Sequence, residues 1–126
     1  LQQQDQRSEK IMMYILLSLA VGLVMLPHIN AKCEPAYYLG CFVDAASRDI
    51  EYGFAYFPGM TLELCQEHCR NLGYKYTGAQ AGSQCFCDND FGKYGSKPDG
   101  ECSWKCVGNN QQKCGGHFRN SVYLVR

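Results

Sequence analysis

The chain has 126 residues, which is enough for one domain, and its 12 acidic and 12 basic side chains leave a formal net charge of zero. That balance excludes the basic field on which non-specific nucleic-acid binding depends. Nine cysteines in so short a chain indicate either a disulfide scaffold or a metal site, and the compartment decides between them.

The N-terminal part of the chain has the pattern of a secretory signal. Polar residues 1–10 are followed by an uncharged apolar run from Ile11 to Leu26. As a helix this run would span about 24 Å, which is shorter than the roughly 30 Å hydrocarbon core of a bilayer. We therefore predict a signal peptide over residues 1–31, cleaved before Lys32, with an uncleaved membrane anchor as the alternative.

The rest of the chain divides into a short N-terminal extension, residues 32–37, and a domain over residues 38–126. Because the chain begins with Leu1, its first residues could be spurious, and Met12 or Met13 could be the true start. We expect a secreted, extracellular protein that keeps no stable membrane span after cleavage.

The first half of the predicted domain contains a strand, a long connection and a helix. Residues 37–43 are rich in β-prone side chains and predict a strand, whereas residues 44–59 predict a long loop. A helix is expected over residues 62–72, with Thr61 as its N-cap and Gly73 as its left-handed terminator.

The predicted helix has an inward and an outward face. Helical spacing places four side chains on the inward face: Leu62, Cys65, Cys69 and Leu72. The side chains expected to face water are Glu63, Gln66, Glu67, His68 and Arg70.

The second half of the domain contains shorter elements. Strands over residues 75–80 and 84–87 are expected to form a hairpin around a tight turn. Residues 91–100 are rich in turn formers, residues 102–106 predict a helical turn, and residues 120–125 predict a closing strand.

Cysteine spacing constrains the disulfides. Cys65 and Cys69, four apart on a helix, lie about 6 Å apart on one face. Cys85 and Cys87, two apart on a strand, are separated by about 6.6 Å. Matching separations favour two parallel disulfides, Cys65–Cys85 and Cys69–Cys87, although the crossed pairing remains open on geometry alone.

The remaining cysteines are assigned less directly. Cys106 and Cys114 enclose a short turn and are expected to pair locally, which leaves Cys41 for Cys102. Cys33 is the odd one: it could form an intermolecular disulfide, and so a homodimer, or stay capped in a disordered segment. A zinc site is the alternative, but no spacing is Cys-x2-Cys, so we expect no metal and no other cofactor.

A set of cysteine, glycine and aromatic motifs runs from residue 38 to residue 125. The set comprises Gly40-Cys-Phe-Val-Asp44 with Arg48, Met60-Thr61, Cys65-x3-Cys69, Gly73, Tyr76, Gly78, Gln84-Cys-Phe-Cys87, Cys102-x3-Cys106, Gly108-Asn109, Cys114-Gly-Gly116 and Asn120-Ser-Val-Tyr123. Together these motifs resemble the WSC domain, a module named for fungal cell-wall stress sensors and found also in Kremen receptors and polycystins.

The resemblance implies a fold and a function. The fold is a small, disulfide-rich α+β domain similar to PAN/apple modules, with one central helix packed on a small antiparallel sheet. The implied disulfides are Cys41–Cys102, Cys65–Cys85, Cys69–Cys87 and Cys106–Cys114, in agreement with the spacing. The implied function is carbohydrate binding. Since the stalk and the additional modules of those receptors are not found in this sequence, we expect a single secreted module rather than a receptor.

Catalysis has little support in the sequence. His68 and His117 belong to no metalloprotease or serine-hydrolase motif. Asp44, Asp49 and Glu51 are carboxylates of one predicted loop, without the marks of an acid/base pair. We therefore predict that the domain is not an enzyme.

Carbohydrate binding suits the composition, because sugar recognition combines flat aromatic faces with planar polar groups. The aromatic candidates are Tyr52, Tyr56, Phe57, Tyr94 and Trp104. Trp104 is also expected to pack in the core, because it lies between two cysteines. The polar candidates are Asp44, Arg48, Gln80, Asn89, Arg119 and Asn120. The expected partner is a glycan or a cell-surface or matrix glycoprotein, and the alternative is a protein-interaction module without sugar binding.

Overall fold

The computed structural model describes residues 36–126, so the predicted signal peptide and Cys33 lie outside the described residues. The elements in chain order are β1 (Tyr37–Val43), β2 (Tyr52–Tyr56), α2 (Leu62–Asn71), β3 (Tyr76–Gln80), β4 (Gln84–Asp88), β5 (Ser96–Lys97), the 3-10 turn η2 (Asp99–Cys102), β6 (Lys105–Cys106), β7 (Asn109–Lys113) and β8 (Arg119–Leu124). No helix within this range is long and apolar enough to cross a membrane.

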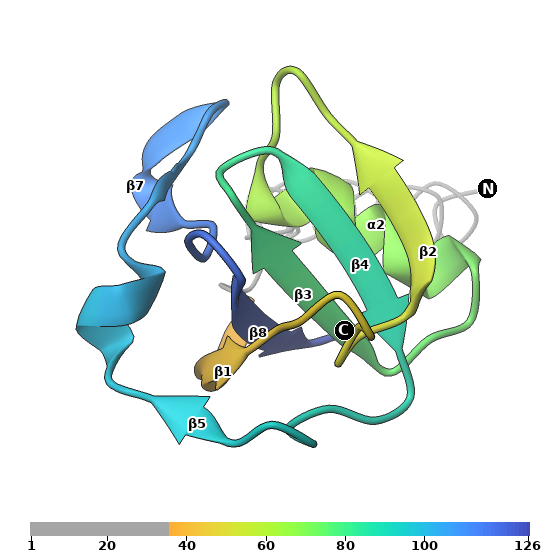
Figure 1. Ribbon diagram of the computed structural model, residues 1–126. Helices are drawn as coiled ribbons and strands as arrows, with labels where there is room; N and C mark the ends of the chain where they lie inside the picture. Colours follow the sequence, from red (N-terminus) through yellow and green to blue (C-terminus); the bar gives the residue numbers. More distant parts are fainter. Residues whose placement is uncertain (1–35) are drawn as a thin grey trace, which may run out of the picture. The chain divides into compact units, whose positions relative to one another are not determined.

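Six strands form one sheet in the order β2-β4-β3-β8-β1-β5 (Figure 1). All neighbouring strands of this sheet run antiparallel. The helix α2 packs on β3 and β4 and lies behind them in the view of Figure 1. The strands β6 and β7 form a separate two-stranded ribbon. The predicted class, a small α+β domain with one helix on an antiparallel sheet, is confirmed.

The helix begins and ends as the sequence predicts. The Thr61 hydroxyl accepts a hydrogen bond from Leu64 N–H over 3.2 Å, which caps the first turn. Gly73, at φ +84°, adopts the left-handed conformation that terminates a helix. Leu72 differs from the prediction: it is the C-cap residue and is 51% exposed beside Gly53 of β2, rather than part of the buried face.

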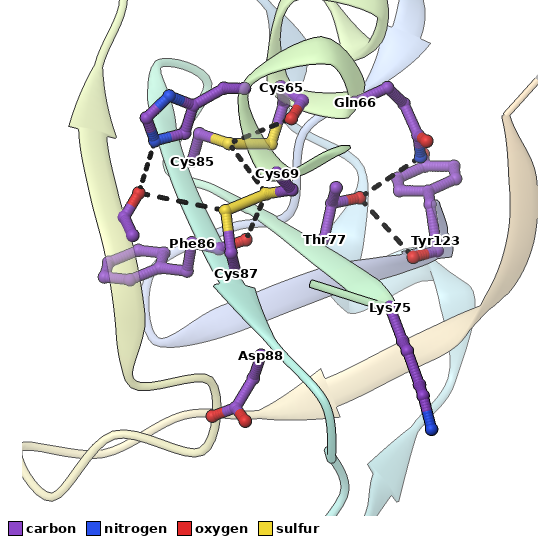
Figure 2. Close-up of a disulfide and its surroundings, with 12 residues drawn as sticks. Cys65, Gln66, Cys69, Lys75, Thr77, Cys85, Phe86, Cys87, Asp88 and Tyr123 are labelled. Carbon is purple, nitrogen blue, oxygen red and sulfur yellow. Dashed lines mark hydrogen bonds between the residues drawn. A yellow bond between two sulfur atoms is a disulfide. The ribbon is translucent and has the colours of Figure 1, made fainter. Parts of the chain in front are cut away.

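Two polar side chains of α2 are less exposed than their helical positions predict. Gln66 is buried, because its Nε2 donates to Leu124 O over 3.1 Å and its Oε1 accepts from Arg126 N–H over 3.2 Å. Figure 2 shows the Gln66 amide beside Thr77 and Tyr123. His68 is half-buried, with Nε2 2.7 Å from the Gly53 carbonyl oxygen. In both cases the hydrogen-bond partners are remote in sequence.

Two disulfides join α2 to β4 side by side (Figure 2). The Cα atoms of Cys65 and Cys85 are 5.5 Å apart, and those of Cys69 and Cys87 are 5.4 Å apart. The other two bonds are Cys41–Cys102 and Cys106–Cys114. These are the four pairs that the spacing and the resemblance both favour, and the parallel arrangement is formed rather than the crossed one.

Each face of the sheet buries its own apolar cluster. Met60, Leu62 and Tyr123 are buried with the helix cysteines on the α2 face. On the opposite face the buried cluster contains Ile50, Phe86 and Val122. Ile50 belongs to the connection between β1 and β2, which crosses this face of the sheet in Figure 1. The connection therefore acts as a second covering layer, and it carries Asp44 and Arg48 across the sheet.

Three segments form strands where loops or turns were predicted. Within the predicted loop 44–59, residues 52–56 form the edge strand β2, which pairs with β4. Residues 96–97 pair with β1 as β5. The predicted helical turn over residues 102–106 is wrong, because η2 ends at Cys102 and the next residues enter β6. The strands β2 and β5 pair with strands distant in sequence, which local patterns do not reveal, whereas β6 pairs with the adjacent strand β7.

Candidate functional site

The described part of the chain contains an open pocket of about 160 Å³. Three segments line this pocket. The connection between β1 and β2 contributes Arg48, the hairpin of β3 and β4 contributes Gln80, Ala81 and Gln84, and the turn before β8 contributes His117 and Phe118. Gln84 precedes Cys85, whose side chain points to α2, so Gln84 points to the opposite face of the sheet. The pocket therefore opens on the face crossed by the connection between β1 and β2. Its lining combines planar hydrogen-bonding groups with an aromatic ring.

Asp44 organises the polar groups of this pocket from beneath. Its buried carboxylate accepts hydrogen bonds from Arg48 Nη1 over 2.5 Å, from Gln80 Nε2 over 2.9 Å and from Asp49 N–H over 2.9 Å. Burial by itself would raise the pKa of Asp44, but the hydrogen bonds outweigh it and hold the pKa below its ordinary value. Asp44 is therefore an ionised group that positions Arg48 and Gln80.

Arg48 is held by aromatic rings as well as by Asp44. Its guanidinium carbon lies 5.1 Å from the centroid of the Phe86 ring and 5.8 Å from that of Phe118. Within residues 36–126, the hydrogen bond that Arg48 donates comes from Nη1. The remaining N–H groups of the planar guanidinium are thus available at the pocket wall, in an orientation set before any ligand arrives.

Two exposed aromatic rings of β2 continue this surface. Tyr56 lies opposite Gln84 in the antiparallel ladder, so their side chains are on one face of the sheet, with Cβ atoms about 5 Å apart. The Phe54 ring lies against Phe86, with 5.1 Å between the ring centroids. Phe54 is 59% exposed and Tyr56 is 62% exposed, so both present ring surface to solvent beside the pocket.

Four of the predicted binding residues come together at this place. Arg48 and Gln80 line the pocket, Tyr56 lies next to it, and Asp44 lies beneath it. Because Asp44 is buried, it would act through Arg48 rather than touch a ligand itself.

The other polar candidates lie outside the pocket lining. Asn120 is fully buried, and neither its Oδ1 nor its Nδ2 has a hydrogen-bond partner among the described residues. Arg119 forms an ion pair with Glu101, with 3.0 Å between Nη2 and Oε1. Asn89 accepts a hydrogen bond from Lys75 N–H over 3.0 Å, in the segment that follows β4.

The other aromatic candidates are distributed over the molecule. Tyr52 stacks on Tyr74, which packs against the α2-side cluster, with 5.9 Å between centroids and 3° between planes. Phe57 packs against the same cluster. The Tyr94 hydroxyl donates to the Ser47 carbonyl oxygen. Trp104 is 51% exposed, so the prediction that it packs in the core is wrong.

The sequence reasoning did not select Phe54, Gln84, His117 or Phe118 as binding candidates. Strand alternation was a usable signal for Gln84, because Cys85 faces the helix and its neighbour must face the other way. No comparable signal marked His117 and Phe118. Phe118 has φ +50°, and the turn that holds it meets the pocket only through tertiary packing.

A metal site is not supported by the cysteine chemistry. The sulfur atoms of Cys65, Cys69 and Cys85 lie within 4.8 Å of one another. All three belong to disulfides, and a disulfide sulfur has no thiolate to offer a metal ion.

Comparisons with known proteins match the chain to one domain family and to parts of several longer proteins. A family model described as "WSC domain" matches residues 38–116. A WSC domain-containing protein of Arthroderma benhamiae is 35% identical over 125 residues, which is 94% of this chain and 13% of that protein. Xylosyltransferase oxt of Drosophila melanogaster is 33% identical over 115 residues, covering 84% of this chain and 13% of the enzyme.

Kremen protein 2 of Homo sapiens is 35% identical over 97 residues, covering 75% of this chain and 21% of that protein. The chain therefore spans only a small part of each of these three relatives. The matched region contains the four disulfides and the pocket residues Arg48, Gln80, Ala81 and Gln84. On these grounds the chain belongs to the WSC domain family.

Proposed function

We propose that this WSC domain is a secreted, non-catalytic module that binds carbohydrate at the pocket beside Arg48. The observation that carries the proposal is the Asp44–Arg48 arrangement, because it presents guanidinium N–H donors in a fixed orientation beside aromatic rings. Sugars offer hydroxyl groups around their edge and C–H groups on their faces, so planar donors and flat rings suit them together.

Gln84 and Tyr56 extend this complementarity. The side-chain amide of Gln84 donates and accepts hydrogen bonds in one plane, which suits a pair of neighbouring sugar hydroxyl groups. Gln84 on β4 lies opposite Tyr56 on β2, whose exposed ring can pack on the face of the sugar. The pocket of about 160 Å³ is smaller than the sites that enclose drug-sized ligands, which favours recognition of one sugar unit at a time.

One relative and the four disulfides support this proposal. This relative is by name a xylosyltransferase, a protein that acts in glycan chemistry, and the chain matches a small part of it. Four disulfides persist in oxidising compartments such as the secretory pathway, which favours secretion. The pocket lining includes one histidine and no carboxylate, which favours binding over acid/base catalysis.

A glycan array with the secreted full chain tests the proposal. We expect the wild type to bind at least one immobilised glycan, and Arg48→Ala and Tyr56→Ala to weaken that binding at least tenfold. Tyr52→Ala is a matched control, because it removes the same kind of side chain from the same strand but on the α2 side. The proposal is wrong if folded wild type binds no glycan, or if Arg48→Ala and Tyr56→Ala bind like the wild type.

A second surface favours a protein partner as the alternative function. Tyr52 and Leu72 are exposed on the α2 side, where Tyr52 stacks on Tyr74. This patch is apolar and lacks the planar charged group of the pocket, so it suits a protein more than a sugar. Loss of a co-purified extracellular protein in Tyr52→Ala, with no glycan bound by the wild type, would support this alternative.

A further inference from the structure

We infer that the sugar bound at this pocket carries a carboxylate, so that the site takes a uronic-acid unit of an acidic glycan in preference to a neutral sugar. The inference rests on the proposed function and adds the chemical class of the ligand. Its basis is that Arg48 uses one edge of its guanidinium for Asp44 and keeps the other edge without a partner among residues 36–126, at the wall of an open pocket.

The guanidinium of Arg48 is a planar group whose edges can each hold a carboxylate through two parallel N–H donors. Asp44 accepts from Nη1. Within the described part of the chain, the edge formed by Nε and Nη2 makes no hydrogen bond. Two donors side by side match the two oxygens of a carboxylate, whereas one sugar hydroxyl group offers them a single oxygen. The open edge therefore suits an acidic sugar better than a neutral one.

The arrangement of charge at the pocket favours an anion as well. The Asp44 side chain is completely buried, whereas 35% of the Arg48 side chain is exposed, so the positive end of the pair faces solvent. A carboxylate on the open edge would lie closer to the guanidinium than to Asp44, and the attraction would exceed the repulsion because both fall with distance. The residues that line the pocket include His117, which offers an N–H donor in either tautomer, and no carboxylate.

Two aromatic rings hold the guanidinium in place and exclude part of its water. Its carbon lies 5.1 Å from the centroid of the Phe86 ring and 5.8 Å from that of Phe118. A hydrogen bond to a charged group is stronger where water is partly excluded, and a guanidinium is more weakly hydrated than an ammonium group. Because Arg48 is oriented before the ligand arrives, little conformational freedom is lost when a carboxylate binds.

The amide of Gln84 suits the remaining groups of such a sugar. Its side chain makes no hydrogen bond within residues 36–126, so its NH2 and its carbonyl oxygen are both open to sugar hydroxyl groups. A uronic acid carries one carboxylate beside several hydroxyl groups, which one arginine edge and one amide can bind together. A densely sulfated chain fits less well, because it needs several cations and the pocket lining has one arginine.

Matched acidic and neutral oligosaccharides test the inference on the full secreted chain. Oligomers of galacturonate, of mannuronate and of hyaluronan would be titrated by calorimetry beside their carboxyl-reduced forms, in which each carboxylate becomes a primary alcohol and the stereochemistry is unchanged. We expect at least one acidic oligomer to bind about tenfold more tightly than its reduced form, a ratio that corresponds to about 1.4 kcal/mol. Added salt should reduce this ratio, because it screens the charge on the ligand.

Variants show whether Arg48 is the source of the preference. Arg48→Gln keeps a planar amide without the charge, so the ratio of the acidic to the reduced affinity should fall to less than about twofold. Gln84→Ala should weaken both forms by a similar factor and leave the ratio unchanged. Arg70→Gln removes an equal charge from an exposed position on α2 and should change neither affinity. Since both ligands are titrated into the same sample, a partial loss of folded protein does not alter the ratio.

The outcomes separate this inference from the proposed function. Equal affinities for acidic and reduced oligomers, or a preference that persists in Arg48→Gln, would overturn the inference and leave glycan binding standing. Heparin provides a sulfate arm: binding that survives carboxyl reduction of heparin but is lost on its desulfation would assign a sulfate ester and overturn the carboxylate. If folded wild type binds no oligomer of either kind and no glycan on the array, both proposals are wrong.

Discussion

Arg48 and Asp44 form an ion pair one helical turn apart in sequence, with 2.5 Å between Nη1 and Oδ2, although no helix contains them. The Asp44 side chain is completely buried, whereas that of Arg48 reaches the surface. The same carboxylate oxygen accepts from Gln80 Nε2, so one buried charge orients two polar groups of the pocket. The arrangement makes Asp44 a positioning residue for the proposed ligand.

Replacing Asp44 by alanine is expected to remove glycan binding and to destabilise the fold. The change leaves Gln80 Nε2 and Asp49 N–H without their acceptor, and we expect a loss of about 2–3 kcal/mol in the free energy of unfolding. Urea denaturation measures it. Arg48→Ala is the matched control. It should lose binding to the same extent as Asp44→Ala but lose less stability, because Arg48 is partly exposed. Equal stability of Asp44→Ala and the wild type would contradict the account.

Acid should weaken the fold through Asp44. Its pKa in the folded protein is lowered, because hydrogen bonds to the carboxylate outweigh the opposing effect of burial. A lowered folded pKa contributes stability above the unfolded value of about 3.9, and this contribution is lost as the pH falls through the folded pKa. Urea denaturation between about pH 5 and pH 2 should show a smaller acid loss for Asp44→Asn than for the wild type. If the free energy of unfolding falls equally with pH in Asp44→Asn and in the wild type, Asp44 is not the cause.

Alkali should weaken the fold through Tyr123. Burial raises the pKa of its phenol to about 12, with a further increase from the negative charge of Asp99 and an opposing decrease from a Ser121 hydrogen bond. A raised folded pKa contributes stability that is complete below the unfolded value of about 10 and is lost as the pH rises toward 12. Between these pH values Tyr123→Phe should lose less stability than the wild type, as measured by denaturation at each pH. The absorbance titration of tyrosinate should also show one late-titrating phenol fewer in this variant.

The four disulfides should differ in their effect on stability. Cys41 and Cys102 are 61 residues apart, whereas Cys106 and Cys114 are 8 apart. In the chain-entropy model, closing the long loop stabilises the fold by about 4 kcal/mol and closing the short one by about 2.5 kcal/mol. Paired serine substitutions at each bond, compared by chemical denaturation, check this order. A larger loss from the short loop than from the long one would show that loop entropy does not set the order.

Gly78 is expected to tolerate no side chain. A Cβ at this position in β3 would lie 2.7 Å from Ile50 Cδ1 and 3.2 Å from Asn120 Cγ, in the buried layer beneath the connection between β1 and β2. Gly78→Ala should therefore destabilise the fold by about 1–3 kcal/mol. Gly100→Ala is the control, since nothing lies within 4 Å of its added Cβ. Gly78→Ala should unfold at a lower temperature than Gly100→Ala. Equal unfolding temperatures of the two variants would contradict this prediction.

Much of the helix and of the central strands could be predicted from local patterns. Thr61 and Gly73 mark the ends of α2 because capping is a property of neighbouring residues. The strand β2 could not be predicted in the same way, because its hydrogen bonds go to β4, about 30 residues away. Gln66 was misplaced for a related reason, since its partners Leu124 and Arg126 lie at the other end of the domain.

The candidate site could be predicted only in part. Arg48, Gln80 and Tyr56 were selected for their chemistry, which is a property of each residue type. Their assembly into one surface was not foreseeable, because they come from a connection, a hairpin end and an edge strand that meet only after folding. Trp104 shows the same limit, because its position between two cysteines suggested burial and the structure exposes it.

The sequence by itself determined the scaffold of this protein. Cysteines at i, i+4 on a helix and at i, i+2 on a strand have matching separations, which favour two parallel bonds, and the family resemblance implies the same two pairs that the structure forms. Only the tertiary structure decided which surface is the candidate site. The orientation of Arg48 depends on a buried carboxylate and on two rings from other segments, and such long-range contacts leave no periodic trace in the chain.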